Sequence, residues 1–169
     1  MRRWLDALYD GAAWLAAACM VGLLVMVLLS ILGRELHFHV PGTDAYAGYL
    51  MAAAGFLALA HTLKRGDHIR VTLLLQYTGR RVHKALEVWA LAAATLLAAL
   101  FAFFSARLVW QSYQFNDVST GNDATPLWLP QIGMAVGTAV LLVAFVDELV
   151  LELRGTRSVP SADEAAHNE

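Results

Sequence analysis

The sequence has little charge and almost no cysteine. Asp, Glu, Lys and Arg make up 15% of its 169 residues, whereas about 25% is usual in soluble domains. The single cysteine, Cys19, cannot form an intramolecular disulfide, so paired-cysteine chemistry is excluded and Cys19 is predicted to be a small packed apolar residue. The sequence also contains no glycine-rich phosphate loop and no nucleophile beside a base. These absences favour a protein without enzyme activity.

Hydrophobic residues, by contrast, make up 59% of the chain and form four long runs. Each run is long enough to cross a hydrocarbon core of roughly 30 Å, which takes about 20 helical residues. We therefore predict an all-α membrane protein with four transmembrane helices and a single membrane domain, residues 1–153. The predicted spans are residues 11–33, 44–63, 85–110 and 128–151. The remaining tail, residues 154–169, is rich in Ser, Pro, Ala and Glu and is predicted to be disordered.

An amphipathic segment, residues 1–10, precedes the first span. Its Trp4 and Tyr9 are typical of the membrane–water interface, and the alternative is a frayed leader. The first span is longer than the roughly 7–15 apolar residues of a signal peptide, and no A-x-A-like cleavage site follows it. We expect this span to be retained as a signal anchor.

Basic residues are concentrated between the second and third spans. The segment from Lys64 to Lys84 holds six of the twelve Lys and Arg residues. Because Lys and Arg near span ends resist translocation, this segment and both termini are predicted to be cytoplasmic, which leaves only Arg34 and Arg107 outside. An apolar stretch within the segment is too short to span and is predicted to lie at the interface, where its basic neighbours bind anionic phospholipid. The residues assigned to lipid headgroups are Arg70, Arg80, Arg81 and Lys84.

Apart from the thiol of Cys19 in the first span, no ionisable side chain that could carry a charge or a proton lies in the middle of any predicted span. Charges inside a bilayer are costly and mark functional sites, so the sequence argues against an acid that carries protons. It also offers no histidine pair at membrane depth to hold a haem, and His61, near a span end, is predicted to be structural. His37 and His39 could touch a metal, but two ligands without a third are weak evidence. Neither a metal nor a cofactor is predicted.

Small residues suggest that the function lies in helix faces. Alanines recur every four residues along the third span, which places them on one face as a close-packing seam; the alternative is ordinary alanine abundance. Gly133 and Gly137 form a G-x-x-x-G face on the fourth span. The residues assigned to helix packing are Ala90, Ala94, Ala98, Ala102, Ala106, Gly133 and Gly137.

Arg34 stands at the outer end of the first span, where positive charge is disfavoured. Asp44 opens the second span across a short loop that contains the Pro41-Gly42 turn signal. We predict an ion pair between Arg34 and Asp44 that joins the two helix ends, with Glu35 as a competing partner. The alternative is an arginine that reaches the outer headgroups.

A set of residues spread over the four predicted spans and their loops forms a recognisable pattern: Arg34, Asp44, Gly55 to Ala58, Arg65, Gly66, His68, Ile69, Val71, Pro126, Pro130 and Gly137. With these residues the chain resembles, over residues 10–153, the DctQ-like small membrane subunit of tripartite ATP-independent periplasmic (TRAP) transporters. Asp44 stands alone at the start of the second span, where this family often has one or two Glu, and Thr72 occupies a position where Asp is common.

The resemblance implies a role in transport across the bacterial inner membrane. In such systems a periplasmic substrate-binding protein captures an organic acid, and a large multi-span permease subunit moves it with a sodium gradient. The small subunit braces the large one and helps to dock the binding protein, without a cofactor or nucleic acid. Two alternatives stay open: a four-helix membrane haem or redox protein, and an autonomous small transporter.

Overall fold

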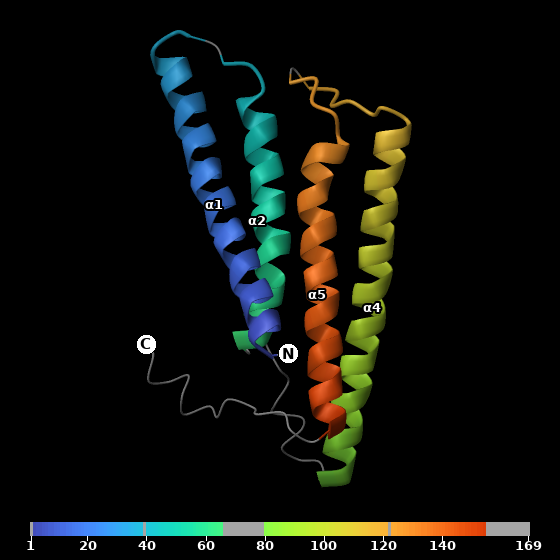
Figure 1. The fold of residues 1–169 in the computed structure, drawn as a ribbon. Helices are drawn as coiled ribbons and strands as arrows, with labels where there is room; N and C mark the ends of the chain where they lie inside the picture. Colours follow the sequence, from blue (N-terminus) through green and yellow to red (C-terminus); the bar gives the residue numbers. More distant parts are fainter. Residues whose placement is uncertain (1, 39, 66–79, 122, 155–169) are drawn as a thin grey trace, which may run out of the picture.

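The computed structural model describes residues 2–38, 40–65, 80–121 and 123–154, which form four α-helices (Figure 1). All four helices are long and apolar enough to cross a membrane, which confirms the predicted all-α fold with four helices suited to span a bilayer. The predicted interfacial segment and the predicted tail from residue 155 onward lie outside the described residues. The helices are α1 (Arg2–Glu35), α2 (Thr43–Arg65), α4 (Arg80–Gln114) and α5 (Trp128–Arg154).

The first helix begins earlier than the predicted span. The sequence suggested a separate segment over residues 1–10, whereas α1 runs without interruption through its 34 residues, or about 51 Å at 1.5 Å per residue. Gly11 does not break the helix, and open space surrounds the position of its missing Cβ. Tyr9 is only 1% exposed, so burial of this ring against the neighbouring helices holds the first turns in place.

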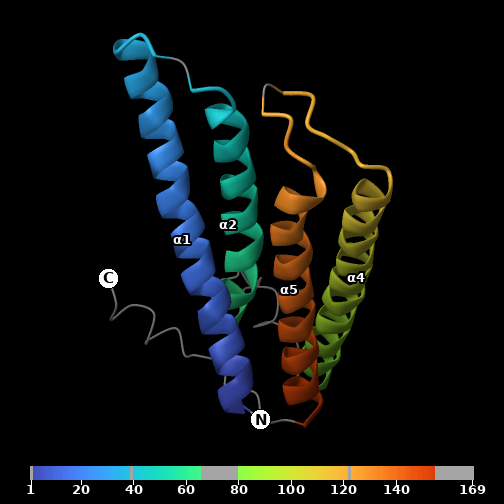
Figure 2. The same ribbon diagram turned by 45° about the horizontal axis from the view of Figure 1, so that its top comes forward.

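The helices pack in the order α1, α2, α5, α4 (Figure 1). Figure 2, turned by 45°, shows the same row, with α2 and α5 in the centre and α1 and α4 on the outside. The loops α1–α2 and α4–α5 lie at one end, here called the loop end. The start of α1 and the end of α5 lie at the opposite end, here called the terminal end. Two helical hairpins are therefore joined mainly through α2 and α5.

The contact between α2 and α5 depends on two glycines. A Cβ added to Gly133 would lie 2.7 Å from the Cβ of Ala53, and one added to Gly137 would lie 2.5 Å from the carbonyl carbon of Phe56. Thr138, next to this contact, is fully buried, and its hydroxyl donates to the carbonyl of Met134 at 2.9 Å. Two helix backbones thus approach closely, as small residues allow in a membrane.

A hydrophobic core lies nearer the terminal end, where α1, α2 and α5 meet. Its aromatic member, Tyr9, comes from α1, and its other members are small or aliphatic. In lipid, such packing replaces the hydrophobic driving force that water would supply. The buried residues of this core are Tyr9, Ala12, Ala60, Leu63, Val140, Leu141 and Ala144.

The fourth member of the row, α4, packs on α5 with a seven-residue period. Its buried positions are Leu91, Ala98, Ser105 and Ser112. The predicted alanine row follows this seam only in its middle: Ala98 is buried, whereas Ala90 and Ala106 at its ends are exposed. Steps of four residues drift by about 40° each around a helix of 3.6 residues per turn, whereas steps of seven drift by only about 20°. The alanine row therefore winds away from α5.

Candidate functional site

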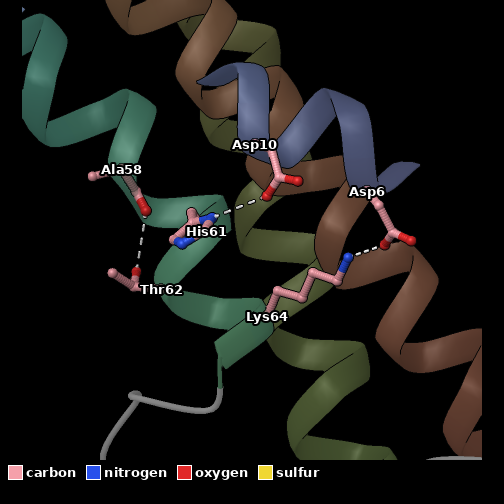
Figure 3. A network of polar contacts seen from close by, with 6 residues as sticks. All are labelled: Asp6, Asp10, Ala58, His61, Thr62 and Lys64. Carbon is pink, nitrogen blue, oxygen red and sulfur yellow. Dashed lines mark hydrogen bonds and ion pairs between the residues drawn. The ribbon is translucent and has the colours of Figure 1, made fainter. Parts of the chain in front are cut away.

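The polar side-chain contacts that join different helices or loops among the described residues lie at the two ends of the row, so the candidate site has two parts. At the terminal end, α1 and α2 are linked by side chains of opposite charge (Figure 3). Lys64 forms an ion pair with Asp6, and its Nζ lies 5.0 Å from the ring centre of Tyr9. His61 Nδ1 lies 3.9 Å from an oxygen of Asp10, which is too long for a hydrogen bond. These contacts fasten α1 to α2.

The strength of this fastening is modest. The side chains of Lys64 and Asp6 are 41% and 48% exposed, and ion pairs with such exposure contribute about 0–1 kcal/mol. His61, the lone histidine that the sequence suggested to be structural, lies beside Asp10 in this cluster. Among the described residues, no group of three or more His, Cys, Asp and Glu side chains could hold a metal ion.

At the loop end, the α4–α5 loop is fastened to α2 through Asp123. This carboxylate accepts a hydrogen bond from Ser119 Oγ at 2.7 Å and another from Tyr49 Oη at 3.2 Å. Thr125 Oγ1 donates to Tyr46 Oη at 3.0 Å. The pKa of Asp123 is lowered below its ordinary value of 3.8, chiefly because the Ser119 hydroxyl stabilises the charged form.

The same loop is braced by its own backbone. The amide of Ser119 donates to the carbonyl of Thr125 at 2.8 Å, and the amide of Leu127 donates to Asp117 at 2.9 Å. Gly42 in the α1–α2 loop has φ of +83°, and a Cβ added there would lie 2.8 Å from the Cβ of Asp123. A side chain at this position would be strained and would also clash. Gly42 therefore lets the two loops meet.

Two helices end at the loop end in the same way. At the end of α1, His37 has φ of 57° and the amide of Phe38 donates to the carbonyl of Gly33 at 3.0 Å. At the end of α4, Asn116 has φ of 51° and the next amide donates five residues back, also at 3.0 Å. This is the Schellman arrangement, which satisfies the free carbonyls of a helix end and usually places Gly in the left-handed position.

The end of α1 and the start of α2 enclose a half-open cavity of about 380 Å³. Arg34 and Asp44 both line it, together with Ser30 and His37. The predicted ion pair is replaced in this structure by a different contact: Asp44 accepts a hydrogen bond from Ser30 Oγ at 3.2 Å. Within the described part of the chain, no ion pair joins Arg34 to Asp44. The structure therefore brings the two residues to one cavity without pairing them.

The other predicted residues fall into three groups. Pro126 forms an isolated bridge with Val118 in the α4–α5 loop, Pro130 lies in the first turn of α5, and Gly55 faces open space on α2. Arg65, a residue of the family resemblance, ends α2. Arg80, Arg81 and Lys84 belong to the start of α4, and their assignment to lipid headgroups stays a prediction. The predicted residues outside the described part of the chain are His39, Gly66, His68, Ile69, Arg70 and Val71.

Reasoning from the sequence missed the contacts that fasten the loop end. Tyr49 and Asp123 are 74 positions apart, and Tyr46 and Thr125 are 79 apart. No periodicity links residues at such separations. The available signal was a polar loop rich in turn residues, which predicts a loop but not the helix that holds it.

One family model matches the chain over residues 23–155, which are 133 of the 169 residues. Its description is "Tripartite ATP-independent periplasmic transporters, DctQ component". The match covers the last 13 of the 34 residues of α1 and all of α2 and α4, and it runs through the end of α5. A search of curated proteins found no match.

Proposed function

Because this chain belongs to the DctQ family of TRAP transporter components, we propose that it is the non-catalytic small permease subunit of an organic-acid uptake system in a bacterial inner membrane. Its role is to brace the large permease subunit and to help dock the substrate-binding protein. The family match over more than half of the chain carries this proposal. The arrangement of polar groups supports it, because the described charges gather near the helix ends and leave the row to act through its faces.

We infer that the large permease subunit packs on one face of α2. Three small residues, Gly48, Ala52 and Gly55, recur there at spacings of four and three, which place them on one side of a helix. All three are exposed, and a Cβ added to Gly48 or Gly55 would meet nothing within 4 Å. By contrast, the space beside Gly133 and Gly137 on α5 is already occupied by α2 of the same chain. A free face of small residues on a central helix suits close contact with a helix of another subunit.

Co-purification tests this contact. Gly55→Leu leaves the fold of the chain intact because open space surrounds Gly55, yet it prevents a partner backbone from approaching. We expect this variant to lose the large subunit on purification. The matched control is Gly11→Leu on α1, which also faces open space and should retain the partner. Normal recovery of the large subunit with Gly55→Leu would contradict the proposed face.

We further propose that the loop end faces the periplasm and contributes to docking of the substrate-binding protein. Support comes from the basic residues between α2 and α4, whose number favours the cytoplasmic side for the terminal end. The hydrogen bonds of Asp123 and Thr125 to α2 would keep the α4–α5 loop in a fixed shape for a partner. A loop that is ordered before binding loses less entropy on docking.

Labelling with a membrane-impermeant maleimide tests this orientation. In a Cys19→Ala background, Thr120→Cys at the loop end should react in intact cells. Arg154→Cys at the terminal end should react only after the membrane is opened. The opposite pattern would reverse the proposed orientation.

Transport itself is tested in vesicles: uptake of the organic acid should require this chain, the large subunit, the binding protein and a sodium gradient together.

A further inference from the structure

The cavity between α1 and α2 at the loop end carries two opposite charges that do not neutralise each other. Arg34 and Asp44 both line it, and among the described residues they form no ion pair. A guanidinium has five donors, and a carboxylate has about four acceptor positions, of which Ser30 uses one at Asp44. Both groups therefore retain hydrogen-bonding capacity toward the cavity. A ligand that suits this cavity carries an anion and a cation of its own.

The backbone shapes the cavity for a small group. Gly33 lies on its wall, and a Cβ added there would be 2.8 Å from the carbonyl oxygen of Phe38. The left-handed turn at His37 folds the chain back over the end of α1. The resulting volume of about 380 Å³ falls within the range of small-molecule sites, roughly 300–1,000 Å³. The cavity is half open, so a ligand can extend out of it.

The position of the cavity, at the ends of two helices suited to span a membrane, favours a lipid as the ligand. It lies where two helices suited to span a membrane end and begin, which is the level of the headgroups. Val27 and Met20 lie seven and fourteen residues before Arg34, on the same side of α1 and toward its middle, and their side chains are 41% and 54% exposed. An acyl chain can lie along these side chains while its headgroup occupies the cavity.

We propose that this cavity binds the headgroup of phosphatidylethanolamine, with the phosphate on Arg34 and the ammonium group on Asp44. Arginine suits phosphate because its planar donors can form two parallel hydrogen bonds. The ammonium group has three N–H donors for the Asp44 carboxylate, whereas the choline group of phosphatidylcholine has none. Phosphatidylglycerol offers the phosphate but no cation. The order of binding is therefore ethanolamine above choline and glycerol.

Native mass spectrometry of the full-length protein in mild detergent tests this order. Equal amounts of the three phospholipids with identical acyl chains are added. The wild-type protein should retain phosphatidylethanolamine about tenfold more than either competitor, as expected for one extra charge-assisted hydrogen bond. Equal retention of the three lipids would overturn the proposal.

Two variants separate the roles of the charges. Asp44→Asn should lower retention of phosphatidylethanolamine to the level of phosphatidylcholine, which itself should not change. Arg34→Gln should lower retention of both lipids, and Arg34→Lys should restore part of it. The matched controls are Asp117→Asn, an exposed loop-end carboxylate, and Arg107→Gln on α4; both should behave as wild type. Unchanged lipid selectivity in Asp44→Asn would refute the assigned contact.

Soluble glycerophosphoethanolamine distinguishes a lipid site from a site for a free zwitterion. Even at an excess of about a hundredfold, which is enough to reveal a competitor that binds about a hundred times more weakly, it should leave the lipid bound. The reason is that it has no acyl chain to lie on α1. Displacement of the lipid at that excess would overturn the membrane-lipid assignment. Circular dichroism of each variant confirms that the helices are retained, so a loss of lipid can be ascribed to the cavity.

Discussion

Replacement of Gly137 by Ala tests the contact that joins the two hairpins. The added Cβ would lie 2.5 Å from the carbonyl carbon of Phe56 and 2.6 Å from its oxygen. Carbon atoms pack best at about 3.5–4.0 Å, so α5 has to move away from α2 by roughly 1 Å. The obstacle is backbone, which cannot turn aside as a side chain can. Overpacking of this kind costs about 1–3 kcal/mol, and a backbone obstacle favours the upper half of that range.

Gly55→Ala provides the matched control on α2. A Cβ added to Gly55 would meet nothing within 4 Å, so no packing is disturbed. Helices of membrane proteins remain largely helical when they separate in detergent, and the gain in helix propensity from Gly to Ala is then small. We expect a change within about 0.5 kcal/mol, as for other surface substitutions.

The assay is unfolding of the full-length protein in mixed micelles with increasing dodecyl sulfate, followed by fluorescence of its five tryptophans. Gly137→Ala should unfold at clearly lower dodecyl sulfate than wild type, by about 2 kcal/mol, whereas Gly55→Ala should match wild type. If Gly137→Ala is as stable as wild type, or if both variants lose stability equally, the inferred backbone contact between α2 and α5 is wrong.

Three further predictions concern the two ends of the row. The folded pKa of Asp123 lies below its ordinary value of 3.8, so the stability that this carboxylate contributes is present above pH 3.8 and is lost as the pH falls further. Hydrogen exchange of the α4–α5 loop should therefore accelerate in acid, and Asp123→Asn should remove this pH dependence. His37→Gly should stabilise the protein by about 0.5–1 kcal/mol, since a left-handed conformation costs a non-glycine residue more than glycine loses in entropy; Asn116→Gly, at a residue that tolerates this conformation better, should gain less in the same unfolding assay. Asp6→Asn should cost less than about 1 kcal/mol, because its ion pair with Lys64 is half exposed; a larger loss would mean that this pair is more important than its exposure indicates.

The spans could be predicted because hydropathy and length are local properties of the sequence. The same holds for the packing role of Gly133 and Gly137, which belong to one helix and share a face. Their partner could not be predicted, since nothing in the sequence pairs Gly137 with Phe56 rather than with another helix. Local reasoning identified the small residues but not the neighbour that makes them necessary.

Predictions at the helix ends were weaker for a different reason. Charge and proximity in the sequence suggested that Arg34 would pair with Asp44. In the structure both residues line one cavity, and Asp44 accepts a hydrogen bond from Ser30 instead. The left-handed conformation of His37, which shapes the turn at the end of α1, leaves no trace in composition. Similarly, the alanine row was identified by spacing, but a step of four residues drifts around the helix and leaves the seam with α5.

The order of the row also has a consequence for synthesis of the chain. Phe56 and Gly137, which touch in the finished protein, are separated by 81 positions, from 56 to 137. At roughly 5–20 residues per second, the ribosome needs about 4–16 s to bridge that interval. The first hairpin thus waits in the membrane with one side of α2 covered only by lipid tails. The groups of α2 that later meet Gly133 and Gly137, at Ala53 and Phe56, carry no charge, so they place no charge against lipid during that interval.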